Sequence, residues 1–128
     1  MNPPRASVLL VEDDAVTAEM IQIFLTDCAE VEHALTAEQA IEMATAKNYA
    51  MALIDIHLGG GPTGITVLQA LREMPPYSTT PFIAVTAYAM VGDKEKFLTA
   101  GFDDYISKPY HKEDLLKVVR LHLPQIPC

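Results

Sequence analysis

The sequence is poor in cysteine, in basic residues and in long apolar runs, and each shortage excludes a class of protein. Its two cysteines, Cys28 and Cys128, give neither a disulfide framework nor a metal-binding spacing, so a reducing cytoplasm is the expected location. Only 9 lysines and arginines face 17 aspartates and glutamates, and the formal net charge of −8 argues against direct nucleic-acid binding. No apolar run approaches the roughly 18 residues of a membrane span, and residues 1–5 do not begin a signal peptide.

The 128 residues that are present alternate between strand-like and helix-like segments from end to end. This length fits one domain of the commonest size. Strands without polar alternation are typical of a sheet covered on both faces, and right-handed crossovers then give a three-layer α/β sandwich. Strands are predicted at 8–11, 31–35, 51–55, from 81, and 104–107, and helices at about 14–28, 36–48, 65–74, 89–99 and 111–123.

Three helix boundaries have their own local signals. Thr36 followed by Gln39 predicts a capping box, in which the hydroxyl accepts from a free amide and the glutamine reaches back. The prolines at 75 and 76 end the third helix, and Gly101 is placed to end the fourth. These signals support five successive βα units.

Polar residues follow four of the predicted strands. Glu12 and Asp13 follow the first strand, Asp55 ends the third, Thr86 the fourth, and Lys108 follows the fifth. Because the carboxyl ends of parallel strands share one edge of a sheet, these residues are expected to converge. Three carboxylates beside a lysine and a threonine suit one task, which is to hold a divalent cation and accept a phosphoryl group.

The order and spacing of these residues resemble the receiver domain of bacterial two-component response regulators. The resemblance covers positions 8 to about 123 and rests on Val-Glu-Asp-Asp at 11–14, Leu-Ile-Asp-Ile at 53–56, Ala-Val-Thr-Ala at 84–87 and Gly-Phe-Asp-Asp-Tyr-Ile-Ser-Lys-Pro at 101–109. It implies a flavodoxin-like (βα)5 fold with a parallel five-stranded sheet of order 2-1-3-4-5. We therefore expect residues 1–128 to form a single receiver domain, with a core at about 7–123 and no effector domain.

The resemblance implies that Asp55 is the phosphoacceptor. It also implies a Mg²⁺ site, which Mn²⁺ could fill, formed by Glu12, Asp13, Asp55 and the backbone carbonyl of His57. Magnesium prefers hard oxygen ligands, and crowded carboxylates at a buried strand end need a neutralising cation. An acid before a helix can instead cap free amides, a role that suits Asp14 better than Asp13.

In the same resemblance, Thr86, the backbone amide of Ala87 and Lys108 bind the phosphoryl group, with the His57 amide completing the cradle. The peptide before the proline that follows Lys108 is expected to be cis. Thr86 and Tyr105 are the implied switch pair: Thr86 moves toward the phosphoryl group, Tyr105 turns inward, and the face formed by the fourth helix, fifth strand and fifth helix is remodelled. The alternative is a half-buried tyrosine that never moves.

The loop after Asp55 departs from the family pattern. The usual Met-Pro pair is replaced by a glycine-rich stretch at 57–64, about one residue longer than the common form. We predict that His57 and Tyr88 tune the lifetime of the phosphoryl group. Glycines at 59, 61 and 64 match a dinucleotide-binding pattern, but they follow the third strand, and the acid expected about 20 residues later is missing.

The first helix spreads apolar residues over roughly half of its circumference, which is wider than a purely core-facing helix needs. In the resemblance, this helix meets the histidine-bearing helices of a kinase or phosphotransfer protein. Close packing between the sheet and the last helix is the alternative explanation.

Together these features predict a signalling switch, not an enzyme, that takes a phosphoryl group from a histidine kinase or phosphotransfer protein, promotes its own phosphorylation and dephosphorylation, and acts on a downstream protein target. The chain looks most like single-domain regulators and hybrid-kinase receivers, and an excised domain would look identical to a stand-alone one. Phosphorylation-dependent dimerisation stays open. The alternatives are a phosphorylation-independent interaction module and an aspartyl phosphatase, which typically has a second acid where His57 stands.

Overall fold

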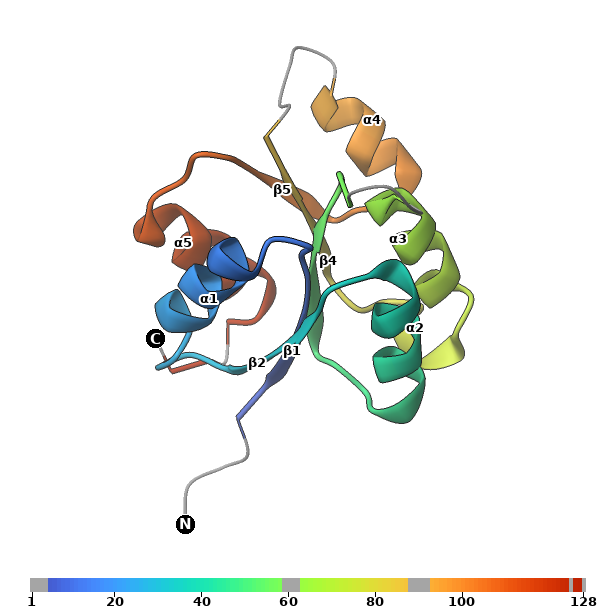
Figure 1. Cartoon of the computed structure of the whole chain (residues 1–128), viewed down its shortest axis with the longest axis horizontal. Coiled ribbons are helices and arrows are strands. Elements are labelled where there is room, and N and C mark those ends of the chain that lie inside the picture. The colour runs from blue at the N-terminus through green and yellow to red at the C-terminus, as the bar shows by residue number, and fades with distance from the viewer. Residues whose placement is uncertain (1–4, 59–62, 88–92, 125, 128) are drawn as a thin grey trace.

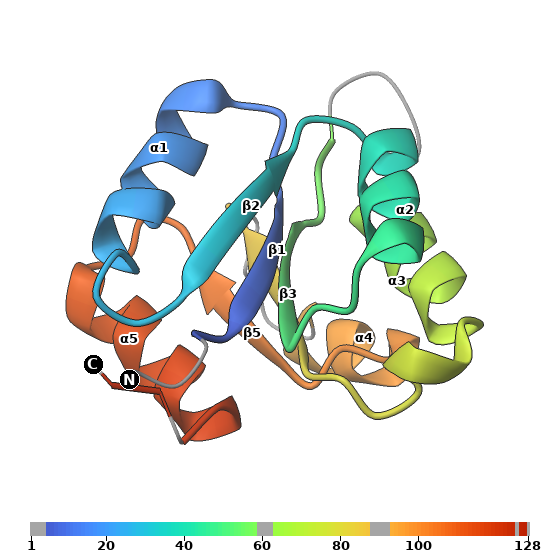
Figure 2. The ribbon, with the colours of Figure 1, turned by 90° about the horizontal axis from the view of Figure 1, so that it is seen from below.

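The computed structural model describes residues 5–58, 63–87, 93–124 and 126–127, with a parallel β-sheet between two layers of helices (Figure 1). Helices α1 and α5 cover one face of the sheet, and α2, α3 and α4 cover the other (Figure 1, Figure 2). The elements in chain order are β1 Ser7–Val11, α1 Ala15–Phe24, β2 Glu30–Ala34, α2 Ala37–Ala46, β3 Met51–Asp55, α3 Gly64–Arg72, a 3-10 turn Pro75–Tyr77, β4 Phe82–Thr86, α4 Asp93–Ala100, β5 Asp104–Ser107 and α5 Lys112–His122.

The sheet has the strand order β2-β1-β3-β4-β5, and every neighbouring pair is parallel. The predicted flavodoxin-like fold is therefore confirmed. Strands β3 and β4 are buried at every position, because helices cover both of their faces, whereas β2 lies at an edge and is mostly half-exposed. All five strands present their carboxyl ends on the same side of the sheet, which is where the polar residues follow.

Each central strand contributes side chains to two separate cores, because successive side chains point to opposite faces of the sheet. On β3, Met51 and Leu53 belong to the core under α1 and α5, whereas Ala52 and Ile54 belong to the core under α2, α3 and α4. This double burial explains why the strands are apolar runs. Among the described residues, no helix is long and apolar enough to cross a membrane.

The predicted ranges of β3 and β5 match the structure, whereas the first helix is shorter than predicted. After Phe24 the chain leaves the helix through tight turns, in which the amides of Thr26 and Cys28 donate to the carbonyls three residues earlier. This turn buries Leu25 and Cys28 in the core. Cys28 is disulfide-bonded, which the cysteine pattern did not predict, and Cys128 lies outside the described residues.

The local helix signals mostly hold. The Thr36 hydroxyl accepts from the Gln39 amide at 3.1 Å, but the Gln39 side chain accepts from Leu35, one residue before the cap. Gly101 ends α4 in the left-handed region, with a φ of 121°, which only glycine adopts readily. The predicted start of α4 at position 89 lies outside the described part of the chain.

Candidate functional site

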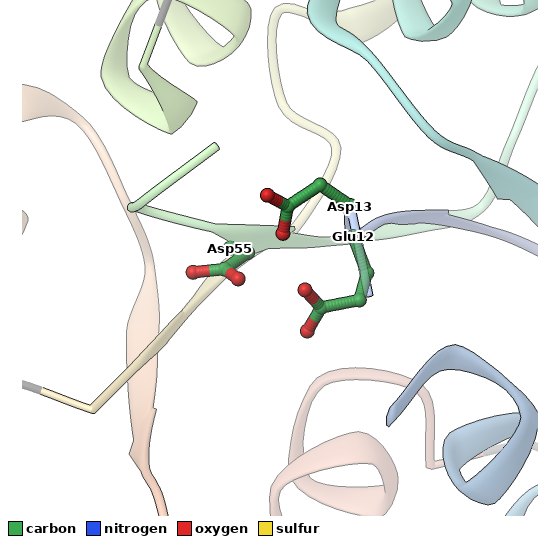
Figure 3. Close-up of side chains that lie close together, drawn as sticks. All are labelled: Glu12, Asp13 and Asp55. Carbon is green, nitrogen blue, oxygen red and sulfur yellow. The ribbon is translucent and has the colours of Figure 1, made fainter. Parts of the chain in front are cut away.

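Three carboxylates meet at the carboxyl ends of β1 and β3 (Figure 3). One oxygen each from Glu12, Asp13 and Asp55 lies within 4.8 Å of the others. Glu12 and Asp55 are 1% and 6% exposed, whereas Asp13 is on the solvent side. The convergence predicted from the strand ends is thus present, with one open side through which a ligand can enter.

Lys108 supplies the positive charge of this cluster. Its Nζ lies 2.9 Å from Glu12 Oε1 and 3.3 Å from Asp55 Oδ2. The backbone holds the lysine in place, because its amide donates to the Thr86 carbonyl at 2.7 Å. The peptide that joins Lys108 to Pro109 is cis, as predicted. The ammonium therefore bridges two strand ends that are 96 and 53 residues away in the sequence.

The burial of this cluster has an electrostatic consequence for Glu12. Burial, and then the hydrogen bond with Asp55, together raise the pKa of Glu12 to about 7, against the opposing effect of Lys108. Burial lowers the pKa of Lys108, but the hydrogen bond with Glu12 and the charge of Asp55 outweigh it, so the net change is upward. One ammonium thus does not fully compensate the negative charge of the site.

The donor set fits a small divalent cation. All three side chains offer hard carboxylate oxygens, which magnesium prefers. Opposite ligands of an octahedral Mg²⁺ are about 4.2 Å apart, so oxygens within 4.8 Å need only small movements to share one ion. A bound cation would also relieve the excess charge that raises the pKa of Glu12. The cluster can therefore hold a metal ion.

The backbone around Asp55 depends on a close approach by α3. An added Cβ at Gly64 would lie 2.2 Å from the Asp55 carbonyl oxygen, so only glycine fits at the start of this helix. The Gly64 amide donates to the Ile56 carbonyl, and the His57 amide donates to Asp55 Oδ1 at 3.0 Å. The need for Gly64 is therefore steric, which explains this part of the apparent dinucleotide motif. Glycines 59 and 61 lie outside the described residues.

Thr86 and Tyr105 lie on adjacent strands on the side of α4. Ala84 pairs with Tyr105 in the sheet, and Thr86 is two residues further along β4. The side chains of Thr86 and Tyr105 therefore point to the same face of the sheet. Thr86 is fully buried, whereas Tyr105 is half-buried with its ring centroid 6.5 Å from that of Phe97. Ala87 is exposed at the end of β4. Tyr88, the second predicted rate-tuning residue, lies outside the described residues.

Asp14 caps α1, as predicted. Its carboxylate accepts from the amides of Val16 and Thr17 and from the Thr17 hydroxyl at 2.5 Å. The hydroxyl contact is the main cause that lowers the pKa of Asp14. Because Asp14 caps the helix, the two preceding acids remain available to the cluster.

Residues 8–120 match the family model of the response regulator receiver domain. The chain belongs to this family. Receiver domains accept phosphoryl groups in two-component phosphorelays, and this receiver domain is a signalling module of that kind.

Curated relatives of the receiver domain include histidine-protein kinases and transcriptional regulatory proteins. It is 34% identical over 119 residues to the signal transduction histidine-protein kinase BarA of Escherichia coli, and 36% identical over 119 residues to the transcriptional regulatory protein DltR of Streptococcus agalactiae. Each alignment covers 92% of this chain. The chain spans 13% of the length of BarA and 52% of that of DltR.

Solved structures show the same fold. The chemotaxis response regulator CheY4 of Vibrio cholerae is 26% identical, with a TM-score of 0.86 over 92% of this chain and 98% of that one. A CheY-like receiver domain protein from Methanospirillum hungatei is 31% identical, with a TM-score of 0.80 over 94% and 95% of the two chains. The family assignment thus agrees with the sheet order and the strand-end cluster.

Two residues of the receiver domain's site escaped the sequence analysis. His33, at the end of β2, contacts the Glu12 carbonyl. Tyr110 has a buried hydroxyl without a hydrogen-bond partner among the described residues, and burial, then the charges of Glu12 and Asp55, raises its pKa to about 12. Polarity at the end of β2 could have indicated His33, whereas nothing in the sequence distinguishes Tyr110 from a core aromatic residue.

Proposed function

We propose that Asp55 accepts a phosphoryl group from a phosphohistidine of a histidine kinase or phosphotransfer protein. The observation that supports this most is the placement of the Asp55 carboxylate, which shares a 4.8 Å cluster with Glu12 and Asp13 and lies 3.3 Å from Lys108 Nζ. Under this proposal, one strand edge holds the nucleophile, the acid pair that binds the metal and the cation that binds the phosphoryl group.

In the proposed step, an Asp55 carboxylate oxygen forms a bond to phosphorus as the phosphorus–nitrogen bond to the donor imidazole breaks. Lys108 pairs with an oxygen of the transferred group, and the Thr86 hydroxyl and Ala87 amide donate hydrogen bonds to the others. Bound Mg²⁺ would offset the charge of these oxygens and of the carboxylates. We assign its ligands to Glu12, Asp13, Asp55 and the His57 carbonyl.

The phosphoryl group would then act as a switch. We assign the response to Thr86 and Tyr105, because the tyrosine is only half-buried beside α4 and can exchange between two packings. The receiver domain would promote both its phosphorylation and its dephosphorylation, with His57 and Tyr88 setting the lifetime. Its target is a downstream protein in the cytoplasm, and dimerisation after phosphorylation stays part of the proposal.

The exposed face of α1 is the proposed docking surface for the donor. Val16, Met20 and Ile23 are 75%, 39% and 62% exposed, and they line a shallow apolar groove on this helix. Helix α1 begins at Ala15, two residues after Asp13, so a helix docked there would present its histidine close to the cluster. The alternative of complete packing within the domain does not account for these exposed side chains.

Mass spectrometry of the intact protein tests the proposed chemistry. The parent, Asp55→Asn and the exposed control Asp27→Asn are incubated with Mg²⁺ and a small-molecule phosphodonor. We expect the parent and Asp27→Asn to gain one phosphoryl group, a gain that chelating the metal abolishes, and Asp55→Asn to gain none. If neither this donor nor a phosphorylated histidine protein modifies the parent, the phosphorylation-independent module becomes the better account.

A further inference from the structure

The peptide that joins the two metal-binding acids is held by the edge strand β2, which lies beside β1 in Figure 2. The Glu12 amide donates to the Ala34 carbonyl at 3.0 Å. The Glu12 carbonyl in turn accepts from Nε2 of His33, and the two atoms are 2.5 Å apart. Both backbone polar groups of Glu12 are therefore held by consecutive residues of a different strand.

The sheet register explains why His33 can reach this carbonyl. His33 pairs with Leu10, so the two side chains point to the same face, and Glu12 is two residues beyond Leu10. A carbonyl oxygen only accepts hydrogen bonds, so Nε2 must carry the proton. This holds for the neutral ring and for the charged ring alike, so the contact does not depend on the ionisation of His33.

We propose that His33 is a positioning residue for the metal site and acts through the peptide between Glu12 and Asp13. A peptide is planar, so the direction of the Glu12 carbonyl fixes the plane from which Asp13 continues. Asp13 is the exposed member of the cluster, and the Glu12 side chain is already held by Lys108. His33 therefore keeps Asp13 turned toward Asp55 before the metal arrives. This inference rests on the proposed metal site.

The variants separate the hydrogen bond from the packing of the ring. His33→Leu keeps a side chain of similar size but removes the donor, whereas His33→Gln can place its amide nitrogen close to the position of Nε2. The control His122→Leu removes the contact of another histidine, which lies on α5 with its Nε2 3.0 Å from Asp104 Oδ2 of β5, outside the cluster of Glu12, Asp13 and Asp55. Mg²⁺ affinity is measured by titration followed through amide NMR shifts.

We expect Mg²⁺ to bind about fivefold more weakly to His33→Leu, the cost of one lost hydrogen bond, and His33→Gln and His122→Leu to stay near the parent. Equal affinity of His33→Leu and the parent would overturn the inference, and so would a loss in His33→Gln as large as in His33→Leu. If the parent itself binds no Mg²⁺, the proposed metal site fails first, and the inference fails with it.

A measurement on the parent alone keeps the inference testable if His33→Leu does not fold. Nitrogen-15 NMR of the imidazole reports which ring nitrogen carries the proton. At a pH where His33 is neutral, we expect the proton on Nε2, whether or not Mg²⁺ is present. A proton on Nδ1 instead would remove the contact on which the inference is built.

Discussion

At the scale of single residues, the site holds three carboxylates beside a single ammonium, so part of its negative charge is uncompensated. Glu12 is almost fully buried, and its pairing with Lys108 does not prevent burial from raising its pKa to about 7. Lys108 contacts both buried carboxylates and is itself only 24% exposed. Removing one partner of a buried ion pair leaves the other charge uncompensated, which is more costly than losing a surface pair.

We therefore predict that Lys108→Met lowers the free energy of unfolding of the metal-free protein by about 2 kcal/mol. Mg²⁺ should restore more stability to this variant than to the parent, because the ion replaces the missing positive charge. The control Lys47→Met removes a largely exposed pair with Glu32 and should cost about 0.5 kcal/mol. Urea unfolding with and without Mg²⁺ measures both, and equal costs in the two variants would contradict the prediction.

The raised pKa of Glu12 also predicts a pH dependence. Between about pH 4.5 and pH 7 the folded protein holds a proton on Glu12 that the unfolded chain has released, so stability falls as pH rises. We expect the metal-free parent to lose on the order of 2 kcal/mol over this window relative to Glu12→Gln, which cannot ionise there. Urea unfolding of both proteins across this pH window checks the prediction. If the free energies of unfolding of the parent and of Glu12→Gln changed in parallel with pH, the pKa of Glu12 would not be raised by folding, and the prediction would be wrong.

At the scale of elements, α1 has one buried face and one exposed apolar face. Ala18 and Ile21 are buried against the sheet, whereas Val16 and Ile23 face solvent. Exposed apolar side chains on one helix contribute little to folding but can be buried by a partner. The exposed face can therefore be changed without changing the fold or the acceptor chemistry.

We predict that Ile23→Glu slows phosphotransfer from a phosphorylated histidine protein about tenfold, the effect of losing one central interface side chain. Phosphorylation by a small-molecule donor should stay unchanged, because the carboxylate cluster is intact. Leu121→Glu is the matched control, since Leu121 is 69% exposed on α5. Both rates are measured by mass spectrometry, and equal transfer to the two variants would place the donor elsewhere.

At the scale of the whole molecule, the site and the Tyr105 face are joined through β4 and β5. The Thr86 carbonyl holds the Lys108 amide, while Tyr105 pairs with Ala84 and packs beside Phe97 of α4. A movement of Thr86 toward Asp55 would therefore change the packing on the α4 side of the sheet, on the strands β4 and β5 that follow β3 in the sheet order.

We predict that Mg²⁺ with beryllofluoride, a mimic of the phosphoryl group, changes amide NMR shifts at the site and also along β5 and α4. In Thr86→Ala, the changes at the site should remain and those near Tyr105 should largely disappear. Thr45→Ala, on the exposed side of α2, is the control and should behave like the parent. A response near Tyr105 that survives in Thr86→Ala would exclude this threonine as the link.

The sequence by itself determined the fold class, the strand order through the family resemblance, and the meeting of Glu12, Asp13, Asp55 and Lys108. It could do so because continuous apolar runs require a sheet covered on both faces, and parallel strands end on one edge. It also placed Asp14 as the cap of α1, since capping is decided within a few neighbouring residues.

Only the tertiary structure decided the features that depend on distances between separate segments. The end of α1 at Phe24, the contact of His33 with the Glu12 carbonyl and the close approach of Gly64 to Asp55 all follow from how elements pack. The raised pKa of Glu12 has the same origin, because burial and neighbouring charges exist only after folding. Local sequence sets which residues reach the strand edge, and packing sets how they act there.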